Sequence, residues 1–306
     1  MVNPPDPHPN PSTRPPGWQR WWIASRPRTL TMAVTPVVVG AALAWSSGWP
    51  VNWPVFLLTL ACAMLIQVAT NLLNDVSDFE RGNDRADRVG PVRVTAAGLA
   101  SPAEVRRAAV IVISVAAMIG AVLAWVGGPA ILALGVFSIA AGWAYSGGAK
   151  PISHGALGEL WVLVFFGVVA VCGSYYLQAH EWSAVSALFG LAIGAMASAV
   201  LLLNNYRDLA ADTIAGRRTL AAVLGPGRSQ LAFASLMLLP LLLPASLALA
   251  KRESRMLWLS WLVLPLLISL VVRMRRLRGP ALNPVLGQTA MAQLLFGLLL
   301  TIGLLL

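Results

Sequence analysis

Residues 107–146 read RAAVIVISVAAMIGAVLAWVGGPAILALGVFSIAAGWAYS, and their only charged residue is Arg107 at the start. One membrane-spanning helix needs about 20 mainly apolar residues, so this stretch is long enough for two. The Gly-Gly-Pro triplet at 127–129 divides it in the middle, and glycine and proline are the strongest local signals for a break in a helix. The sequence therefore predicts two membrane helices, over 107–126 and 129–146.

Comparable apolar segments recur along the whole chain of 306 residues. Hydrophobic residues make up 58% of it and charged residues 11%, whereas about 25% of the residues of a soluble domain are charged. Mean hydropathy is +0.72. We predict an all-α membrane bundle of about nine transmembrane helices, in which residues 26–306 form a single domain. The segments lie at roughly 29–46, 54–74, 107–126, 129–146, 157–177, 183–205, 229–250, 256–272 and 285–305.

Residues 1–25 differ from the rest of the chain in composition. Seven of the first 16 residues are proline, and no apolar run with a cleavage site is present, so a secretory signal peptide is not indicated. We expect a disordered Pro-rich tail here.

Basic residues indicate the orientation of the bundle. With the N-terminus inside, all but three of the 22 lysines and arginines fall in inner segments, the exceptions being Lys251, Arg252 and Arg255. Cytoplasmic loops of membrane proteins carry such an excess, so we expect a cytoplasmic N-terminus and an outer C-terminus. The same distribution accounts for the net charge of +10. It argues against a nucleic-acid partner, because no basic face larger than a loop exists.

Two short stretches resemble each other. Residues 72–78 read LLNDVSD and residues 202–208 read LLNNYRD. They stand at the ends of the second and sixth predicted helices, which are an even number apart, so both stretches should end at the same membrane face. The pattern suggests two parallel four-helix units followed by a ninth helix.

Both stretches place amide and carboxylate side chains on one face of a helix. Carboxylates at the C-terminal end of a helix oppose its dipole and repel one another, so a counter-charge is required. Oxygen ligands suit Mg²⁺, which binds a few carboxylates together with substrate phosphates. We predict two facing clusters that bind a diphosphate through Mg²⁺. They comprise Asn71, Asn74, Asp75 and Asp78 in the first, and Asn204, Asp208 and Asp212 in the second.

Basic side chains near both clusters are candidates for contacts with the diphosphate, because guanidinium groups bind phosphate oxygens bidentately. The alternative is that they only follow the positive-inside distribution of any membrane protein. Such a site suits ionisation of an allylic diphosphate, whose leaving group needs its charge neutralised. Aromatic residues such as Tyr145 would surround the resulting cation. The basic candidates are Arg81, Arg85, Arg88, Arg93, Lys150, Arg207, Arg217 and Arg218.

These residues resemble the UbiA superfamily of intramembrane prenyltransferases. Two features favour the branch that acts on 1,4-dihydroxy-2-naphthoate over the branches that act on 4-hydroxybenzoate or haem: a Tyr-Ser-Gly-Gly stretch, and the NNYRD sequence followed by GRRTL. The resemblance runs from about residue 20 to 225 and is carried by WIASRPRTL at 22–30, NLLNDVSD at 71–78, YSGG at 145–148, NNYRD at 204–208 and GRRTL at 216–220.

The resemblance implies an Mg²⁺-dependent enzyme of menaquinone biosynthesis in the bacterial inner membrane, with its active site facing the cytoplasm. It would condense a polyprenyl diphosphate with 1,4-dihydroxy-2-naphthoate and release diphosphate and CO₂. The implied metal ligands are Asn74, Asp75, Asp78, Asp208 and Asp212. The residues implied to bind the substrates are Asn71, Asn204, Arg207, Lys150, Arg217 and Arg218, with Tyr145 in the same site and Arg26 or Arg93 on the naphthoate carboxylate.

Three questions stay open on the sequence alone. Glu159, just inside the fifth segment, is an ionisable membrane residue and hence a functional candidate: it would orient the hydroxyl of the aromatic substrate, or form an ion pair with Lys150. The acceptor could be another aromatic such as 4-hydroxybenzoate. A secondary transporter would place its ionisable residues near the bilayer midplane, whereas the acidic clusters here stand at helix ends.

Overall fold

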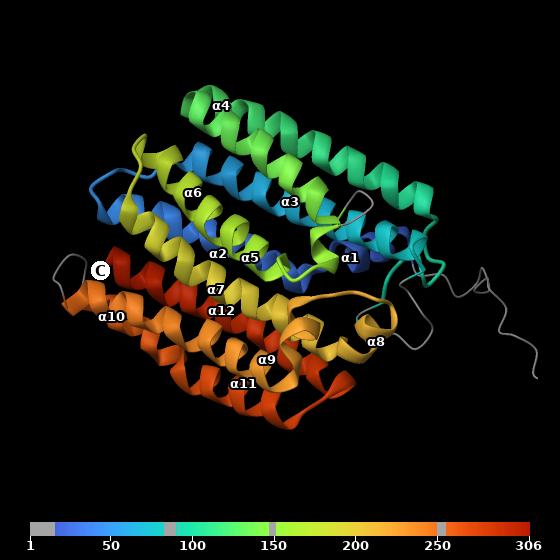
Figure 1. Cartoon of the computed structure of the whole chain (residues 1–306). Helices are drawn as coiled ribbons and strands as arrows, with labels where there is room; N and C mark the ends of the chain where they lie inside the picture. Colours follow the sequence, from blue (N-terminus) through green and yellow to red (C-terminus); the bar gives the residue numbers. More distant parts are fainter. Residues whose placement is uncertain (1–15, 83–89, 91, 147–150, 250–254) are drawn as a thin grey trace, which may run out of the picture.

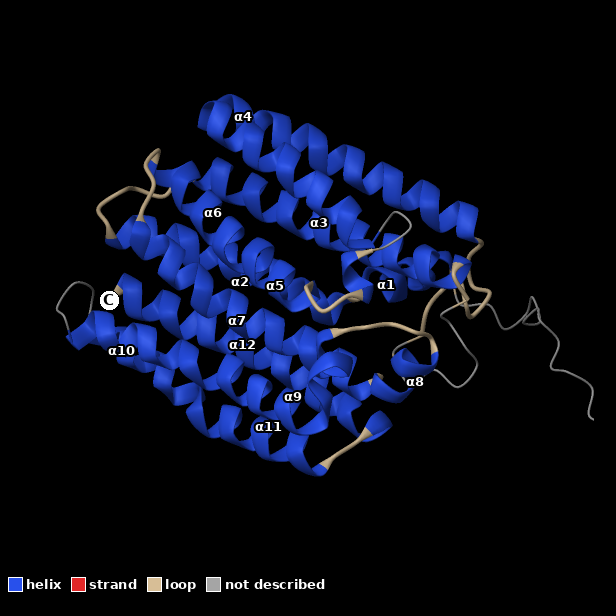
Figure 2. Cartoon of the chain, viewed as in Figure 1, coloured by secondary structure: helices blue, strands red, loops and turns tan. Residues whose placement is uncertain are grey.

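The computed structural model describes residues 16–82, 90, 92–146, 151–249 and 255–306. All regular structure in these ranges is helical and none is strand (Figure 2), so the all-α prediction is confirmed. The main helices are α1 (Gly17–Ser25), α2 (Pro27–Ser46), α3 (Trp53–Glu80), α4 (Pro102–Ser146), α5 (Gly158–Leu163), α6 (Ala170–Ala179), α7 (Ala184–Arg207), α8 (Leu209–Ile214), α9 (Leu220–Leu238), α10 (Leu242–Leu249), α11 (Leu264–Arg276) and α12 (Asn283–Leu305). Short turns of other helix types are η2 (Ile152–His154), η3 (Val164–Val169), η4 (Leu239–Leu241), η5 (Arg255–Val263) and η6 (Gly279–Leu282).

Eight stretches of the described chain are long and apolar enough to cross a membrane. Seven of them match predicted spans one for one. The eighth, α4, has 45 residues and contains both helices predicted over 107–126 and 129–146. Gly128 interrupts it with φ 72° and ψ −164°, a conformation almost confined to glycine, and the chain reverses there (Figure 1). The protein is therefore an integral membrane protein built as a polytopic helical bundle.

The N-terminal segment differs from its prediction. Gly17–Ser25, assigned by sequence to the tail, form α1, and Ala24 is buried against a cluster that includes Leu72 and Val76 of α3. The prolines that indicate disorder stop at Pro16, and the apolar residues after it recur at helical spacing. Composition averaged over residues 1–25 concealed that local pattern.

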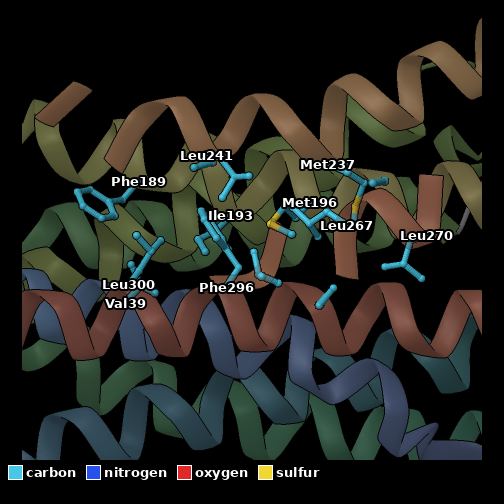
Figure 3. Close-up of a cluster of buried hydrophobic side chains, with 14 of the residues drawn as sticks. Val39, Phe189, Ile193, Met196, Met237, Leu241, Leu267, Leu270, Phe296 and Leu300 are labelled. Carbon is cyan, nitrogen blue, oxygen red and sulfur yellow. The ribbon is translucent and has the colours of Figure 1, made fainter. Parts of the chain in front are cut away.

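The largest buried cluster joins α7 to the C-terminal helices (Figure 3). α7 supplies a ridge of side chains at helical spacing. α9, α12 and α2 pack against it, and α11 packs in turn against α9 and α12. The region after residue 226, which carries no motif, therefore builds much of the core. Residues of this cluster include Val39, Phe189, Ile193, Met196, Met237, Leu241, Leu267, Leu270, Phe296 and Leu300.

α3 and α7 run in the same direction along the bundle. Both end near α1 and α8, whereas the C-terminus of α12 lies at the opposite end (Figure 1). Each starts at a side-chain cap: Asn52 Oδ1 accepts the N–H of Val55 at 3.3 Å, and Ser183 Oγ accepts the N–H of Ser186 at 3.4 Å. The two similar stretches therefore finish at one end of the molecule, as the repeat predicts.

Candidate active site

A cavity of ≈1260 Å³ lies among the N-terminal and central helices, and it exceeds the roughly 300–1,000 Å³ of a typical small-molecule pocket. α3 contributes residues every three or four positions, so one face of this helix lines the cavity along most of its length. These residues are Thr59, Cys62, Ala63, Ile66, Gln67, Thr70, Asn71, Asn74, Asp78 and Arg81.

The cavity has a polar end, and the rest of it is a long apolar part, called the apolar length below. The polar end lies at the C-terminal ends of α3 and α7, and the lining continues past Phe165 to Leu123 and Ile131, which flank the reversal of α4. Trp161 packs against Phe165 on this wall, with ring centroids 5.0 Å apart. The lining suits a ligand with a charged head and a long apolar chain.

The first polar cluster is centred on Asp78 near the end of α3. A guanidinium nitrogen of Arg93 lies 2.5 Å from Asp78 Oδ2, and His154 Nε2 lies 3.5 Å from Oδ1. One turn earlier, Asn74 Oδ1 accepts a hydrogen bond from Ser146 Oγ at 2.7 Å. A carboxylate, an amide and a guanidinium group thus meet on the cavity wall.

The second cluster is held together by Arg207, whose side chain is 1% exposed. Arg207 donates two hydrogen bonds to the carboxylate of Asp208, at 2.8 and 2.6 Å. It also donates to Asn204 Oδ1 at 2.9 Å and to Asn283 Oδ1 at 3.0 Å. Because Asn283 begins α12, this arginine joins the second predicted motif to the C-terminal helix.

Asp212, in α8, is buried and accepts a hydrogen bond from Arg217 on Oδ1 at 3.0 Å. Its Oδ2 is buried too and has no hydrogen-bond partner within the described residues. Burial raises the pKa of the Asp212 carboxyl; Arg217 lowers this pKa, and the carboxylates of Asp208 and Asp78 raise it. The connection before α5 links the two clusters: Arg217 donates to the carbonyl oxygen of Ser153 at 3.3 Å, and the next residue, His154, lies 3.5 Å from Asp78. Both clusters therefore face the same polar end of the cavity.

The sequence predicts a metal ligand at Asp75, and the hydrogen bonds of this carboxylate favour a different role. Asp75 is 1% exposed and is not on the cavity wall. Its carboxylate accepts the backbone N–H groups of Val94 at 3.0 Å and Thr95 at 3.1 Å, and also the Thr95 hydroxyl. A helix turns about 100° per residue, which puts Asp78 about 40° from Asn74 but Asp75 about 100° from it. Asp75 thus holds the loop that carries Arg93.

The other predicted site residues divide into two groups. Arg218 is exposed, does not line the cavity and uses its backbone N–H to donate to the carbonyl oxygen of His154 at 3.0 Å. Glu159 is buried and does not line the cavity. Arg85, Arg88 and Lys150 lie outside the described residues. The predicted residues on the wall are Arg26, Asn71, Asn74, Asp78, Arg81, Arg93, Tyr145, Asn204, Arg207, Asp208, Asp212 and Arg217.

Sequence reasoning missed three polar residues of this end. His154 stands four residues after Lys150 in the same short connection, and that proximity was the available signal. Asn205 is part of the NNYRD stretch and lines the cavity, but only its neighbours were assigned a role. Asn283 has no motif around it, and only the packing of α12 brings it to Arg207.

The sequence matches the model of the UbiA prenyltransferase family over residues 33–303. The chain belongs to this family. Among its relatives is a 1,4-dihydroxy-2-naphthoate octaprenyltransferase of Mycobacterium tuberculosis, 38% identical over 286 residues that cover 91% of this chain and 94% of that protein. The Escherichia coli protein of the same name is 36% identical over 292 residues, 93% of this chain and 94% of its own.

Solved structures of the family share the fold at low sequence identity. An apo UbiA homologue from Aeropyrum pernix has a TM-score of 0.70 at 16% identity, covering 89% of this chain and 97% of that one. A UbiA homologue from Archaeoglobus fulgidus bound to GPP and Mg²⁺ has a TM-score of 0.65 at 15% identity, covering 94% of this chain and 99% of that one.

Proposed function

We propose that this chain transfers a polyprenyl group from a polyprenyl diphosphate to 1,4-dihydroxy-2-naphthoate, with loss of CO₂, as an Mg²⁺-dependent step of menaquinone biosynthesis. One observation carries the proposal: a single cavity joins two facing carboxylate clusters to an apolar, aromatic-lined length. The charged end suits a diphosphate and the apolar length suits an isoprenoid chain. Relatives 30–38% identical over most of the chain bear the name of this activity, which supports the choice of acceptor.

The donor atoms at the polar end fit Mg²⁺. They are carboxylate and amide oxygens, the ligand type that this ion prefers, and Asp212 Oδ2 has no hydrogen-bond partner in the described structure. Three or more His, Cys, Asp or Glu side chains do not converge on one point within the described residues. That agrees with a metal bound partly through substrate phosphates. The residues proposed to hold it are Asn74, Asp78, Asp208 and Asp212.

When bound, Mg²⁺ would neutralise the diphosphate and help it to leave. The chain's own contribution is three arginines, each paired with one carboxylate of the site: Arg93 with Asp78, Arg207 with Asp208 and Arg217 with Asp212. All three line the cavity. They hold the carboxylates in place before substrate arrives, and we assign them to the phosphate oxygens of the leaving diphosphate.

The apolar length has a second role, which is to keep water from the allylic cation. Water is excluded by side chains such as Met32, Val37 and Leu134, and the rings of Phe165 and Phe166 offer faces to a positive charge. A dry site favours attack by the aromatic ring over hydrolysis. We place the polar end at the cytoplasmic face of a bacterial inner membrane, in line with the excess of basic residues on that side.

A competition assay tests the proposal. Purified protein in detergent receives one prenyl diphosphate, Mg²⁺ and a mixture of 1,4-dihydroxy-2-naphthoate and 4-hydroxybenzoate, and products are separated by mass. We expect prenylated naphthalenediol together with CO₂. Prenylation of 4-hydroxybenzoate alone would assign another acceptor. If the detergent assay releases no diphosphate, and protein reconstituted into vesicles takes up either compound, the protein is a transporter and not this enzyme.

A further inference from the structure

Glu159 stands at the start of α5, inside the membrane bundle, and is 3% exposed. Its Oε1 accepts a hydrogen bond from Asn205 Nδ2 at 2.9 Å. Its Oε2 is buried and finds no hydrogen-bond partner among the described residues. None of the described cations pairs with it, and Lys150 lies outside the described residues. An ionisable group buried in a membrane helix is costly and marks a functional position by default.

Close helix packing holds this pair in place. α5 and η3 press against α7 through glycines, and a Cβ on Gly194 would lie 2.3 Å from the carbonyl oxygen of Leu163. Ser198 Oγ donates a hydrogen bond at 2.6 Å to the backbone carbonyl of Glu159. Glu159 is thus held against α7 by its backbone carbonyl and by its side chain, and Asn205 lies about one helix turn before Asp208 of the second cluster.

Asn205 separates Glu159 from the cavity. It is 4% exposed and lines the wall, whereas Glu159 does not. A side-chain amide has one oxygen that accepts and one NH₂ group that donates. One of the two N–H groups serves Glu159, and the oxygen, which accepts no hydrogen bond within the described part of the chain, is the only acceptor that the amide offers a ligand.

Asn205 Oδ1 can only accept hydrogen bonds, so its hydrogen-bond partner in the ligand must be a donor. A diphosphate and a substrate carboxylate offer acceptors, so neither matches Asn205 Oδ1. A ring hydroxyl offers a proton and does match. A hydrogen bond from that hydroxyl also pushes electron density into the ring, which makes the carbon that receives the prenyl group more nucleophilic.

We propose that Asn205 Oδ1 binds a ring hydroxyl of the aromatic acceptor, and that Glu159 is a positioning residue that fixes the Asn205 amide in the required orientation. The inference rests on the proposed function, because it assumes a hydroxylated aromatic in the cavity. It extends that function by assigning the acceptor subsite to α5 and α7, beside the diphosphate site and separate from it.

The test is a double-substitution cycle in which one change is made in the enzyme and the other in the substrate. Wild type and the Glu159→Leu and Asn205→Ala variants are assayed with 1,4-dihydroxy-2-naphthoate and with its two mono-O-methyl ethers. For the wild-type enzyme, kcat/KM with one of the two ethers should be about 10- to 100-fold lower than with the parent acceptor. That factor corresponds to the loss of one hydrogen bond to a polar or charged group. Each variant should lose a similar factor with the parent acceptor and little more with that ether.

Two further readouts separate this role from a structural one. The KM for prenyl diphosphate and the Mg²⁺ requirement should stay at wild-type values in both variants. Ser186→Ala is the control on the same helix, because the Ser186 hydroxyl donates to the carbonyl oxygen of Ser183 at the other end of α7 and contacts neither Glu159 nor Asn205, so this variant should behave as wild type. Prenyl diphosphate binding shows whether each variant is folded, and Asn205→Ala carries the test if Glu159→Leu is not folded.

Contrary results have distinct meanings. If the loss of kcat/KM in a variant assayed with the ether equals the product of the two separate losses, the hydroxyl does not bind Asn205 and the assignment is overturned. A changed Mg²⁺ requirement would assign its oxygen to the metal instead. If wild type fails to prenylate 1,4-dihydroxy-2-naphthoate but accepts another phenol, the proposed function fails, and the same cycle with that phenol and its methyl ether still decides the present inference.

Discussion

Replacing Asp75 with alanine tests whether this carboxylate holds a loop or a metal. The side chain is 1% exposed and accepts the backbone N–H groups of Val94 and Thr95 at 3.0 and 3.1 Å. A buried N–H that loses its acceptor costs about 1–3 kcal/mol, so the two together should lower the free energy of unfolding by about 2–6 kcal/mol. The Mg²⁺ concentration for half-maximal activity should stay at the wild-type value, because the carboxylate does not face the cavity.

The fluorescence of the 12 tryptophans reports unfolding as SDS is titrated into detergent micelles, and activity is measured where the variant is still folded. Glu80→Ala is the control on the same helix, since the Glu80 side chain is 46% exposed and pairs with Arg106 at the surface. Exposed pairs are worth about 0–1 kcal/mol. Asp78→Asn should show the opposite behaviour to Asp75→Ala, with a raised Mg²⁺ requirement and a smaller loss of stability. An Asp75→Ala protein as stable as Glu80→Ala, with a raised Mg²⁺ requirement, would refute the reasoning.

Two other substitutions probe the packing and the phosphate site. Gly194→Ala would put a Cβ 2.3 Å from the carbonyl oxygen of Leu163 and should cost about 1–3 kcal/mol in the same SDS titration. Gly227→Ala, with no atom within 4 Å of its added Cβ, should not destabilise, and equal losses at both sites would contradict the packing. Arg207→Lys keeps the charge but loses the two-pronged contact with Asp208, so the KM for prenyl diphosphate should rise about tenfold. Unchanged kinetics would mean that charge alone matters at Arg207.

The membrane helices could be predicted from sequence because the bilayer imposes their length and composition. Even the reversal inside α4 was indicated by the Gly-Gly-Pro triplet, since the conformation at Gly128 excludes most other residues. α1 could not be predicted by the same rule. It is nine residues long, too short to cross a bilayer, and it is stabilised by packing against α3.

The site was predicted in outline but not in detail. Spacing placed Asn71, Asn74, Asp75 and Asp78 on one side of a helix, yet they cover an arc of about 100°, and only packing decides which part of that arc meets the cavity. For this reason Asp75 serves a loop while Asp78 lines the wall. Asn283 was beyond reach because its role depends on how α12 packs, which no local pattern encodes.

The central claim is that the two carboxylate clusters form one binding site. Binding of a prenyl thiodiphosphate, which reacts slowly, should be measured at fixed Mg²⁺ in wild type, Asp78→Asn, Asp208→Asn and the double variant. We expect each single substitution to weaken binding strongly and the double variant to be little worse than either, because groups that act as a unit are not additive. Losses that simply multiply, or full binding when one cluster is removed, would contradict a site shared by both clusters.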